Sequence, residues 1–121
     1  MTVEEELRLR YGVLLAALAL AGCGRAGADL HRGYFSNGFE TVAFRECGST
    51  EVWWVDGESE AMQSLTEQYM ELAGFSYREV YVELRGDVSA PGAYGHLGAY
   101  PREFHVTETV AVGGDPPSDC N

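Results

Sequence analysis

Alternating apolar and polar positions mark several short strands after residue 32. The segments Gly33 to Phe35 and Glu40 to Arg45 are rich in aromatic and β-branched residues, and the Asn37-Gly38 pair between them is typical of a hairpin turn. A third run, Glu51 to Val55, is bounded on both sides by glycine and turn residues. These patterns predict three successive strands, the first two joined as a hairpin.

The spacing of apolar positions changes between Ser59 and Ala73, where they recur at intervals of three and four. This period predicts a helix of about four turns. Ser59 is a suitable N-cap, and Gly74 stands where a left-handed C-terminal cap is expected. The residues predicted on the buried helix face are Met62, Leu65, Tyr69 and Leu72.

Alternation returns after the helix. A strand is predicted over Glu79 to Val88, with a bulge at Gly86. The glycine-rich segment Pro91 to Pro101 predicts a long surface loop, and a last strand runs from about Arg102 to Val112. The inward positions of the two strands are Val80, Val82, Leu84, Phe104 and Val106.

The order of these elements predicts a mainly β fold. Five strands with one helix between the third and the fourth is the order of an OB-type, partly open barrel. Closing the sheet in this way also protects strand edges that would otherwise pair with other chains.

Composition limits the partners of this fold. The chain has 121 residues, with 8 Lys+Arg against 19 Asp+Glu and a net charge of -11. One domain fits this length. The acidic balance opposes binding to nucleic acid and to anionic lipid headgroups, so neither is an expected partner.

The N-terminal segment predicts export. From Tyr11 to Gly22 the chain is apolar over twelve residues, whereas crossing a bilayer takes about 20. Such a run, ending in small residues before a cysteine, is typical of a secretory signal. The sequence Leu20-Ala21-Gly22-Cys23 resembles the lipobox of bacterial lipoproteins, which implies cleavage before Cys23 and its acylation by fatty acids such as palmitate. The alternative is a buried N-terminal helix with an incidental cysteine.

The predicted organisation has three parts. Residues 1–22 form the cleaved signal peptide, residues 23–32 a small, polar, lipid-anchored tether, and residues 33–121 the barrel domain. Gly24, rather than Asp, follows the acylated cysteine, and the lipoprotein sorting pattern then implies the outer membrane, with the domain facing the periplasm.

Two cysteines remain once Cys23 is assigned to lipid. Cys47 and Cys120 would meet an oxidising compartment, where disulfides form and persist. A bond between them would stabilise the domain by roughly 4 kcal/mol in the chain-entropy model. The alternative is a free, buried Cys47 and a frayed tail that carries Cys120.

Several short motifs, in this order behind a lipobox, resemble the C-terminal OB domain of NlpE-type lipoproteins of the bacterial envelope. The resemblance covers about Gly33 to Cys120. It rests on Gly33-Tyr34-Phe35, Phe44-Arg45-Glu46-Cys47, the strand Glu51 to Val55, the helix through Tyr69, the strand Val80 to Gly86, and the cysteine near the C-terminus. It implies a disulfide between Cys47 and Cys120 and a link to envelope stress, surface sensing or copper tolerance. The family's N-terminal domain with its Cys-x-x-Cys has no counterpart here.

Aromatic side chains are the candidate ligand or partner face. Adjacent Trp53 and Trp54 point to opposite faces of their strand, so one is expected in the core and the other outside. The outward indole is either a ligand platform or packed beneath the helix or loop. The residues of the predicted face are Trp53, Trp54, Tyr81, Tyr94 and Tyr100.

Catalytic and metal chemistry are weaker interpretations. The segment Gly57-Glu58-Ser59-Glu60-Ala61 resembles a nucleophile elbow. Asp87 and either His96 or His105 follow it in the order found in hydrolases. However, Ala61 stands where the motif has its last glycine, and helix capping explains Ser59 better. His31, His96 and His105, with Met62 and Met70, are copper-compatible types without ligand spacing. No catalytic residue, metal site or cofactor is predicted.

The expected function is that of a non-enzymatic, lipid-anchored envelope protein whose OB-type module contacts another protein or simply decorates the membrane. The alternative is an envelope lipoprotein that binds a small ligand, either an oligosaccharide or peptidoglycan fragment, or copper.

Overall fold

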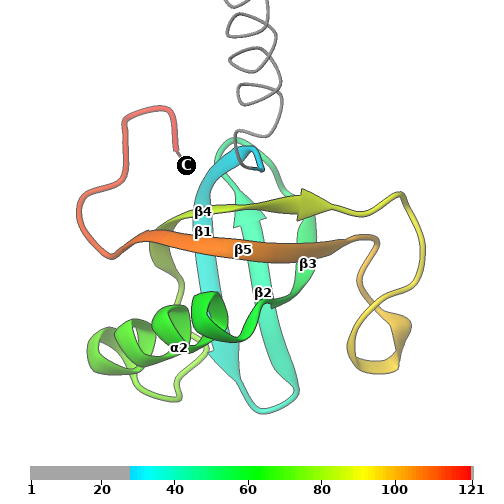
Figure 1. Cartoon of the computed structure of the whole chain (residues 1–121), viewed down its shortest axis with the longest axis horizontal. Coiled ribbons are helices and arrows are strands. Elements are labelled where there is room, and N and C mark those ends of the chain that lie inside the picture. Colours follow the sequence, from blue (N-terminus) through cyan, green and yellow to red (C-terminus); the bar gives the residue numbers. More distant parts are fainter. Residues whose placement is uncertain (1–27, 121) are drawn as a thin grey trace, which may run out of the picture.

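Strands dominate the computed structural model, which describes residues 28–120 (Figure 1). Its elements in chain order are β1 (Leu30–Gly38), β2 (Thr41–Glu46), β3 (Val52–Gly57), α2 (Ser59–Ala73), β4 (Val80–Val88), the 3₁₀ turn η1 (His96–Gly98) and β5 (Glu103–Val112). The mainly β fold, with a helix between the third and fourth strands, is therefore confirmed.

The five strands form one sheet that closes into a barrel in the order β1-β2-β3-β5-β4. β1 pairs with both β2 and β4, which closes the ring, and β3 and β5 run parallel while the other neighbours are antiparallel. Helix α2 lies across one end of the barrel, beside β5 (Figure 1). The Thr109 hydroxyl on β5 donates a hydrogen bond of 2.8 Å to the carbonyl oxygen of Ala61 on α2.

The barrel interior is filled by apolar side chains from every strand and from α2. Phe44 and Phe104 meet edge to face with ring centroids 5.0 Å apart, and Phe35 meets Tyr69 of the helix at 5.2 Å. The fully buried side chains are Phe35, Phe44, Leu65, Tyr69, Val82, Leu84, Phe104 and Val106. The predicted inward positions of β4 and β5 are thus confirmed.

Gly86 lets β4 and β5 approach each other closely. A Cβ at Gly86 would overlap the carbonyl oxygen of His105 on β5 and the ring of Phe104. The β4–β5 register shifts between Arg85 and Gly86, so the predicted bulge is confirmed.

The hairpin between β1 and β2 is confirmed, but its turn is not at Asn37-Gly38. Gly38 pairs with Thr41, which leaves Phe39 and Glu40 as the two turn residues, and Glu40 has φ 58°. Gly38 is instead the last residue of β1, where only a glycine fits because a Cβ would overlap the ring of Tyr77.

Helix α2 has the predicted bounds, yet its ends differ from the expectation. Glu58 rather than Ser59 occupies the N-cap, and no side-chain hydrogen bond caps the helix. Gly74 has φ 63° with ψ -160°, which is not the left-handed helical conformation. Leu72, predicted on the buried face, is exposed, whereas Ala61, Leu65 and Tyr69 are the buried residues of the helix.

The predicted tether is partly wrong, because β1 already begins at Leu30 and pairs with β4 from there. His31 therefore belongs to the barrel. The predicted signal peptide and Cys23 lie outside the described residues. Within residues 28–120, no helix has the length and apolarity needed to cross a bilayer.

Candidate functional site

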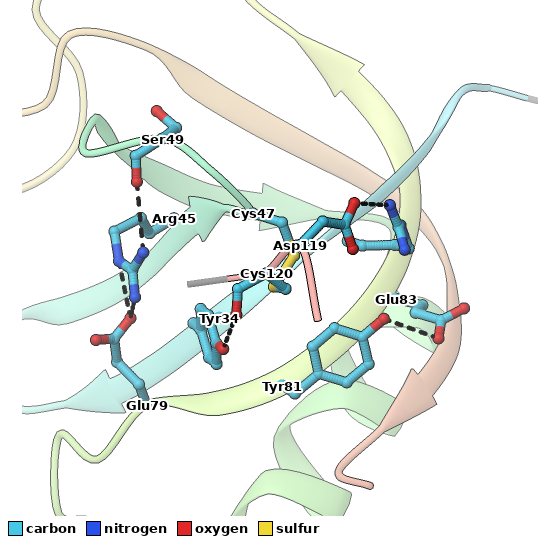
Figure 2. The surroundings of a disulfide bond; sticks show 10 residues. Tyr34, Arg45, Cys47, Ser49, Glu79, Tyr81, Glu83, Asp119 and Cys120 are labelled. Carbon is cyan, nitrogen blue, oxygen red and sulfur yellow. Dashed lines mark hydrogen bonds and ion pairs between the residues drawn. A yellow bond between two sulfur atoms is a disulfide. The ribbon is translucent and has the colours of Figure 1, made fainter. Parts of the chain in front are cut away.

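The C-terminal tail is fastened across the start of β1 and the end of β2 (Figure 2). A disulfide joins Cys47, just after β2, to Cys120, with Cα atoms 4.3 Å apart. The Tyr34 hydroxyl donates a hydrogen bond of 2.8 Å to the Cys120 carbonyl oxygen, and Arg32 pairs with Asp119 at 3.2 Å. Cys120 is buried, so the tail is part of the packed structure.

Tyr81 of β4 lies beside this tail. Its ring meets that of Tyr34 at 6.3 Å, and its backbone oxygen accepts a hydrogen bond of 2.7 Å from Gly113 N–H. Only 7% of the residue is exposed, and its hydroxyl donates to Glu83 at 3.1 Å. Burial first, and then the Glu83 carboxylate, raise the pKa of the Tyr81 phenol.

A hollow of about 240 Å³ opens on the outer surface of the sheet where β1, β2 and β3 adjoin. Arg45 lies along one side, with its guanidinium carbon 4.8 Å from the centre of the Tyr34 ring and a nitrogen 3.0 Å from Glu79 (Figure 2). The lining residues are Tyr34, Ser36, Ala43, Phe44, Arg45, Val52 and Glu79. The hollow thus combines an aromatic edge, a hydroxyl and a paired charge.

A second hollow, of about 210 Å³, adjoins the disulfide. It is lined by Leu30, Arg32, Glu46, Cys47 and Asp119. Its charged groups are already paired, Arg32 with Asp119 and Glu46 with His31, so this hollow offers less for recognition than the first.

The structure does not gather the predicted aromatic face into one surface. Trp53 points inward and packs on Phe44 and Phe104, so it is a core residue. Tyr81 is buried beside the tail. Sequence patterning could not show this burial, since the segment that covers Tyr81 comes from the far end of the chain.

The other three residues of that face do lie together, around the β4–β5 loop. The Trp54 and Tyr100 rings have centroids 5.3 Å apart, and Tyr94 pairs with Tyr100 as an isolated bridge. A Cβ at Gly95 would overlap the Trp54 indole, so the loop backbone covers one face of that ring. Of the two fates predicted for the outward indole, packing beneath a loop is the one observed.

Each histidine of the described chain has a carboxylate partner of its own. His31 pairs with Glu46, His96 Nε2 lies 3.0 Å from Glu40, and His105 Nδ1 lies 3.1 Å from Asp56. Residues 28–120 contain no group of three metal-ligating side chains with suitable geometry. Of the two methionines named above, Met62 packs against the core and Met70 is exposed on α2.

A pair of carboxylates lies on the outer surface next to Trp54. Glu103 of β5 is the direct partner of Trp54 in the parallel β3–β5 ladder, and Asp56 is two residues farther along β3. Burial first, and then the Asp56 carboxylate, raise the pKa of Glu103, while His105 lowers it. Negative charge is therefore concentrated where Glu103 and Asp56 lie close together.

The residues of the possible nucleophile elbow are not assembled. Ser59 is the first residue of α2 and is exposed. In the part of the chain described, Ser59 has no hydrogen bond to His96, His105 or Asp87. His96 is instead paired with Glu40 and His105 with Asp56.

Tyr34, Ser36 and Arg45 were missed as site residues by sequence reasoning. They occupy alternate positions of the predicted hairpin, which is a signal for an outward face. The hollow between them depends on the small side chain of Ala43 and on the register of three strands, which periodicity does not give.

Comparison of the chain with protein-family models, with curated proteins and with solved structures gives no match.

Proposed function

We propose that this chain is a non-enzymatic, lipid-anchored protein of the bacterial envelope, in which an OB-type barrel serves as an interaction module. Acylated Cys23 holds it in the outer membrane, facing the periplasm, and its partner is another envelope protein. The proposal includes the link to envelope stress or surface sensing that the resemblance to NlpE-type lipoproteins implies.

The topology supports the OB type. The strand order β1-β2-β3-β5-β4, a parallel β3–β5 pair and a helix between β3 and β4 are features expected of a five-stranded barrel of this kind. In such barrels the face of strands 2 and 3 and the loops β1–β2 and β4–β5 bind ligands. The hollow beside Arg45 lies on this face.

The disulfide is the observation that carries the proposal. The Cys47–Cys120 bond, with Cys120 buried and the tail fastened on both sides of it, fits a compartment where disulfides persist. It agrees with the lipobox, which is an independent indication of export.

The anchor is tested by expressing the full chain and a Cys23→Ala variant in a bacterium with two membranes. We expect acyl mass on Cys23 of the wild type, fractionation with outer-membrane markers, and release of the variant. A mature wild-type chain without acyl mass would refute the anchor. Fractionation with inner-membrane markers would refute the outer-membrane location.

The interaction is tested with a photo-crosslinking residue at Val52, which lines the hollow, and a matched one at exposed Val110 on β5. In intact envelopes we expect a discrete adduct from position 52 only. Identical adducts from both positions, or none from either, would count against a partner at this face.

A second candidate function is binding of an oligosaccharide or peptidoglycan fragment. The aromatic, hydroxyl and guanidinium groups lining the hollow favour it, and Trp54 is the strand partner of Ala43 in its floor. A saturable change in tryptophan fluorescence with peptidoglycan fragments, absent in Ser36→Val, would support it. The same titration with copper distinguishes the metal alternative, and a flat response to both removes the two together.

A further inference from the structure

Exposed apolar side chains occur on three connections that lie toward the end of the barrel opposite the start of β1 (Figure 1). They come from the β1–β2 turn, the α2–β4 connection and the β4–β5 loop. Phe39 is 68% exposed, Phe75 59%, Tyr77 50% and Leu97 89%. We call Phe39, Phe75, Tyr77 and Leu97 the distal apolar patch. Exposed apolar groups gathered in this way mark interaction sites more often than scattered ones do.

Contacts between the three connections hold the patch together. The Tyr77 hydroxyl donates to the Phe39 carbonyl oxygen at 3.0 Å, and Tyr77 N–H donates to Asn37 at 3.2 Å. On the other side, His96 of the β4–β5 loop pairs with Glu40 of the turn at 3.0 Å. The apolar side chains are therefore displayed on a fixed backbone, which lowers the entropy cost of binding.

Backbone strain is concentrated at the same place. Within residues 28–120, the non-glycine residues with positive φ are Glu40 (58°), Tyr77 (62°) and Leu97 (58°). Each lies in one of the three connections that form the patch. Such conformations cost free energy and cluster at functional sites, and here two of the three strained residues are themselves exposed apolar side chains.

Charge selects the kind of partner. The chain carries a net charge of -11, and Glu40 and Glu71 lie near the patch residues in sequence, Glu40 being paired with His96. Every arginine of the described chain is engaged within the fold, at Arg32, Arg45, Arg78, Arg85 and Arg102. A second copy of the chain and an anionic membrane are both repelled by this charge.

We propose that the distal apolar patch docks a protein segment that carries both arginine or lysine and apolar side chains. Its apolar side chains cover Phe39, Phe75, Tyr77 and Leu97, and its cations are attracted by the net negative charge of the chain. None of these four residues lines the hollow beside Arg45, so the patch is a second contact surface of the proposed interaction module, on whose function this inference rests.

A defined peptide tests the proposal without a membrane, so its outcome does not depend on whether Cys23 is acylated. The probe is a fluorescein-labelled peptide of alternating arginine and leucine, titrated with the full chain carrying Cys23→Ser and followed by fluorescence anisotropy. Controls replace every arginine of the peptide by glutamate, or every leucine by serine. We expect saturable binding of the first peptide only, weakened as salt rises from about 0.05 to 0.5 M.

Two substitutions locate the site without disturbing the core. Phe39→Ser changes an exposed turn residue, and Leu97→Asn introduces a residue that tolerates positive φ. Together they are expected to weaken binding at least about tenfold, since central apolar anchors dominate such interfaces. The matched control, Val110→Ser, removes an apolar side chain of 44% exposure on β5 and is expected to leave the affinity within about twofold.

Several results would overturn the proposal. These are unchanged binding by the double variant, an equal loss in Val110→Ser, or equal binding of the glutamate peptide. A dimer in sedimentation velocity that Leu97→Asn abolishes would identify a second copy as the occupant instead. Patch-dependent binding to anionic phospholipid vesicles would identify a membrane.

Discussion

Removing the Cys47–Cys120 bond should destabilise the barrel by an amount that follows from its position in the chain. The bonded residues are 73 positions apart. In the chain-entropy model, closing a loop of that length lowers the conformational entropy of the unfolded chain, which raises the free energy of unfolding by about 4 kcal/mol. With a urea m-value of about 1.5 kcal/mol/M, the unfolding midpoint should fall by roughly 3 M.

The assay compares Cys47→Ser, Cys120→Ser and the double variant, all on the full chain carrying Cys23→Ala. Because both single substitutions remove the same crosslink, their losses should be similar, and the double variant should be no less stable than either. The contacts of the tail at Tyr34 and Arg32 remain available in all three variants.

The cycle also defines what would refute the reasoning. Losses that add in the double variant would show that the two cysteines act independently. Two reactive thiols in the oxidised parent, labelled under denaturing and non-reducing conditions, would exclude the bond directly. An unfolding midpoint that does not change when a reductant is added to the parent would show that the crosslink contributes no stability.

Three further outcomes are expected. Tyr69→Phe removes a hydroxyl that donates to the Arg78 carbonyl oxygen at 2.7 Å from a fully buried ring, so thermal and urea unfolding should show a loss of about 1–3 kcal/mol; an unchanged midpoint would contradict this. The raised pKa of Glu103 favours its protonated form in the folded state. The free energy of unfolding therefore falls as the pH rises from the pKa of this carboxyl in the unfolded chain through its pKa in the folded protein. Glu103→Gln should therefore raise the urea midpoint at pH 7, with the gain disappearing near pH 4. The Tyr81 phenol should ionise above its usual pKa in an ultraviolet titration, and Glu83→Gln should lower its pKa only in part, because burial is the larger cause.

Local patterns predicted the elements well where neighbouring residues decide the structure. The helix at Ser59–Ala73 has its predicted bounds because a 3.6-residue period coincides with turn residues at both ends. The inward positions of β4 and β5 followed from alternation, since one face of each strand is buried. The bulge at Gly86 followed from the only glycine in its strand.

Errors arose where distant segments decide. The dipeptide Asn37-Gly38 is a strong turn signal, yet the ring of Tyr77 requires the glycine inside the strand. Tyr81 alternates as an outward residue, but the end of the chain covers it. The hollow beside Arg45 depends on the register of three strands, and a one-dimensional pattern carries no information about which strands become neighbours.

The early start of β1 sets the reach of the module. Only a short stretch separates Cys23 from Leu30, where the barrel begins, and fully extended chain of that length spans about 25 Å. β1 itself has nine residues and adds roughly 30 Å to the far end of the barrel. A lipid at Cys23 would therefore confine the domain to a layer of about 55 Å above the bilayer. Partners that stay deeper in the periplasm would be out of range, whereas those on the same membrane would meet it at high effective concentration.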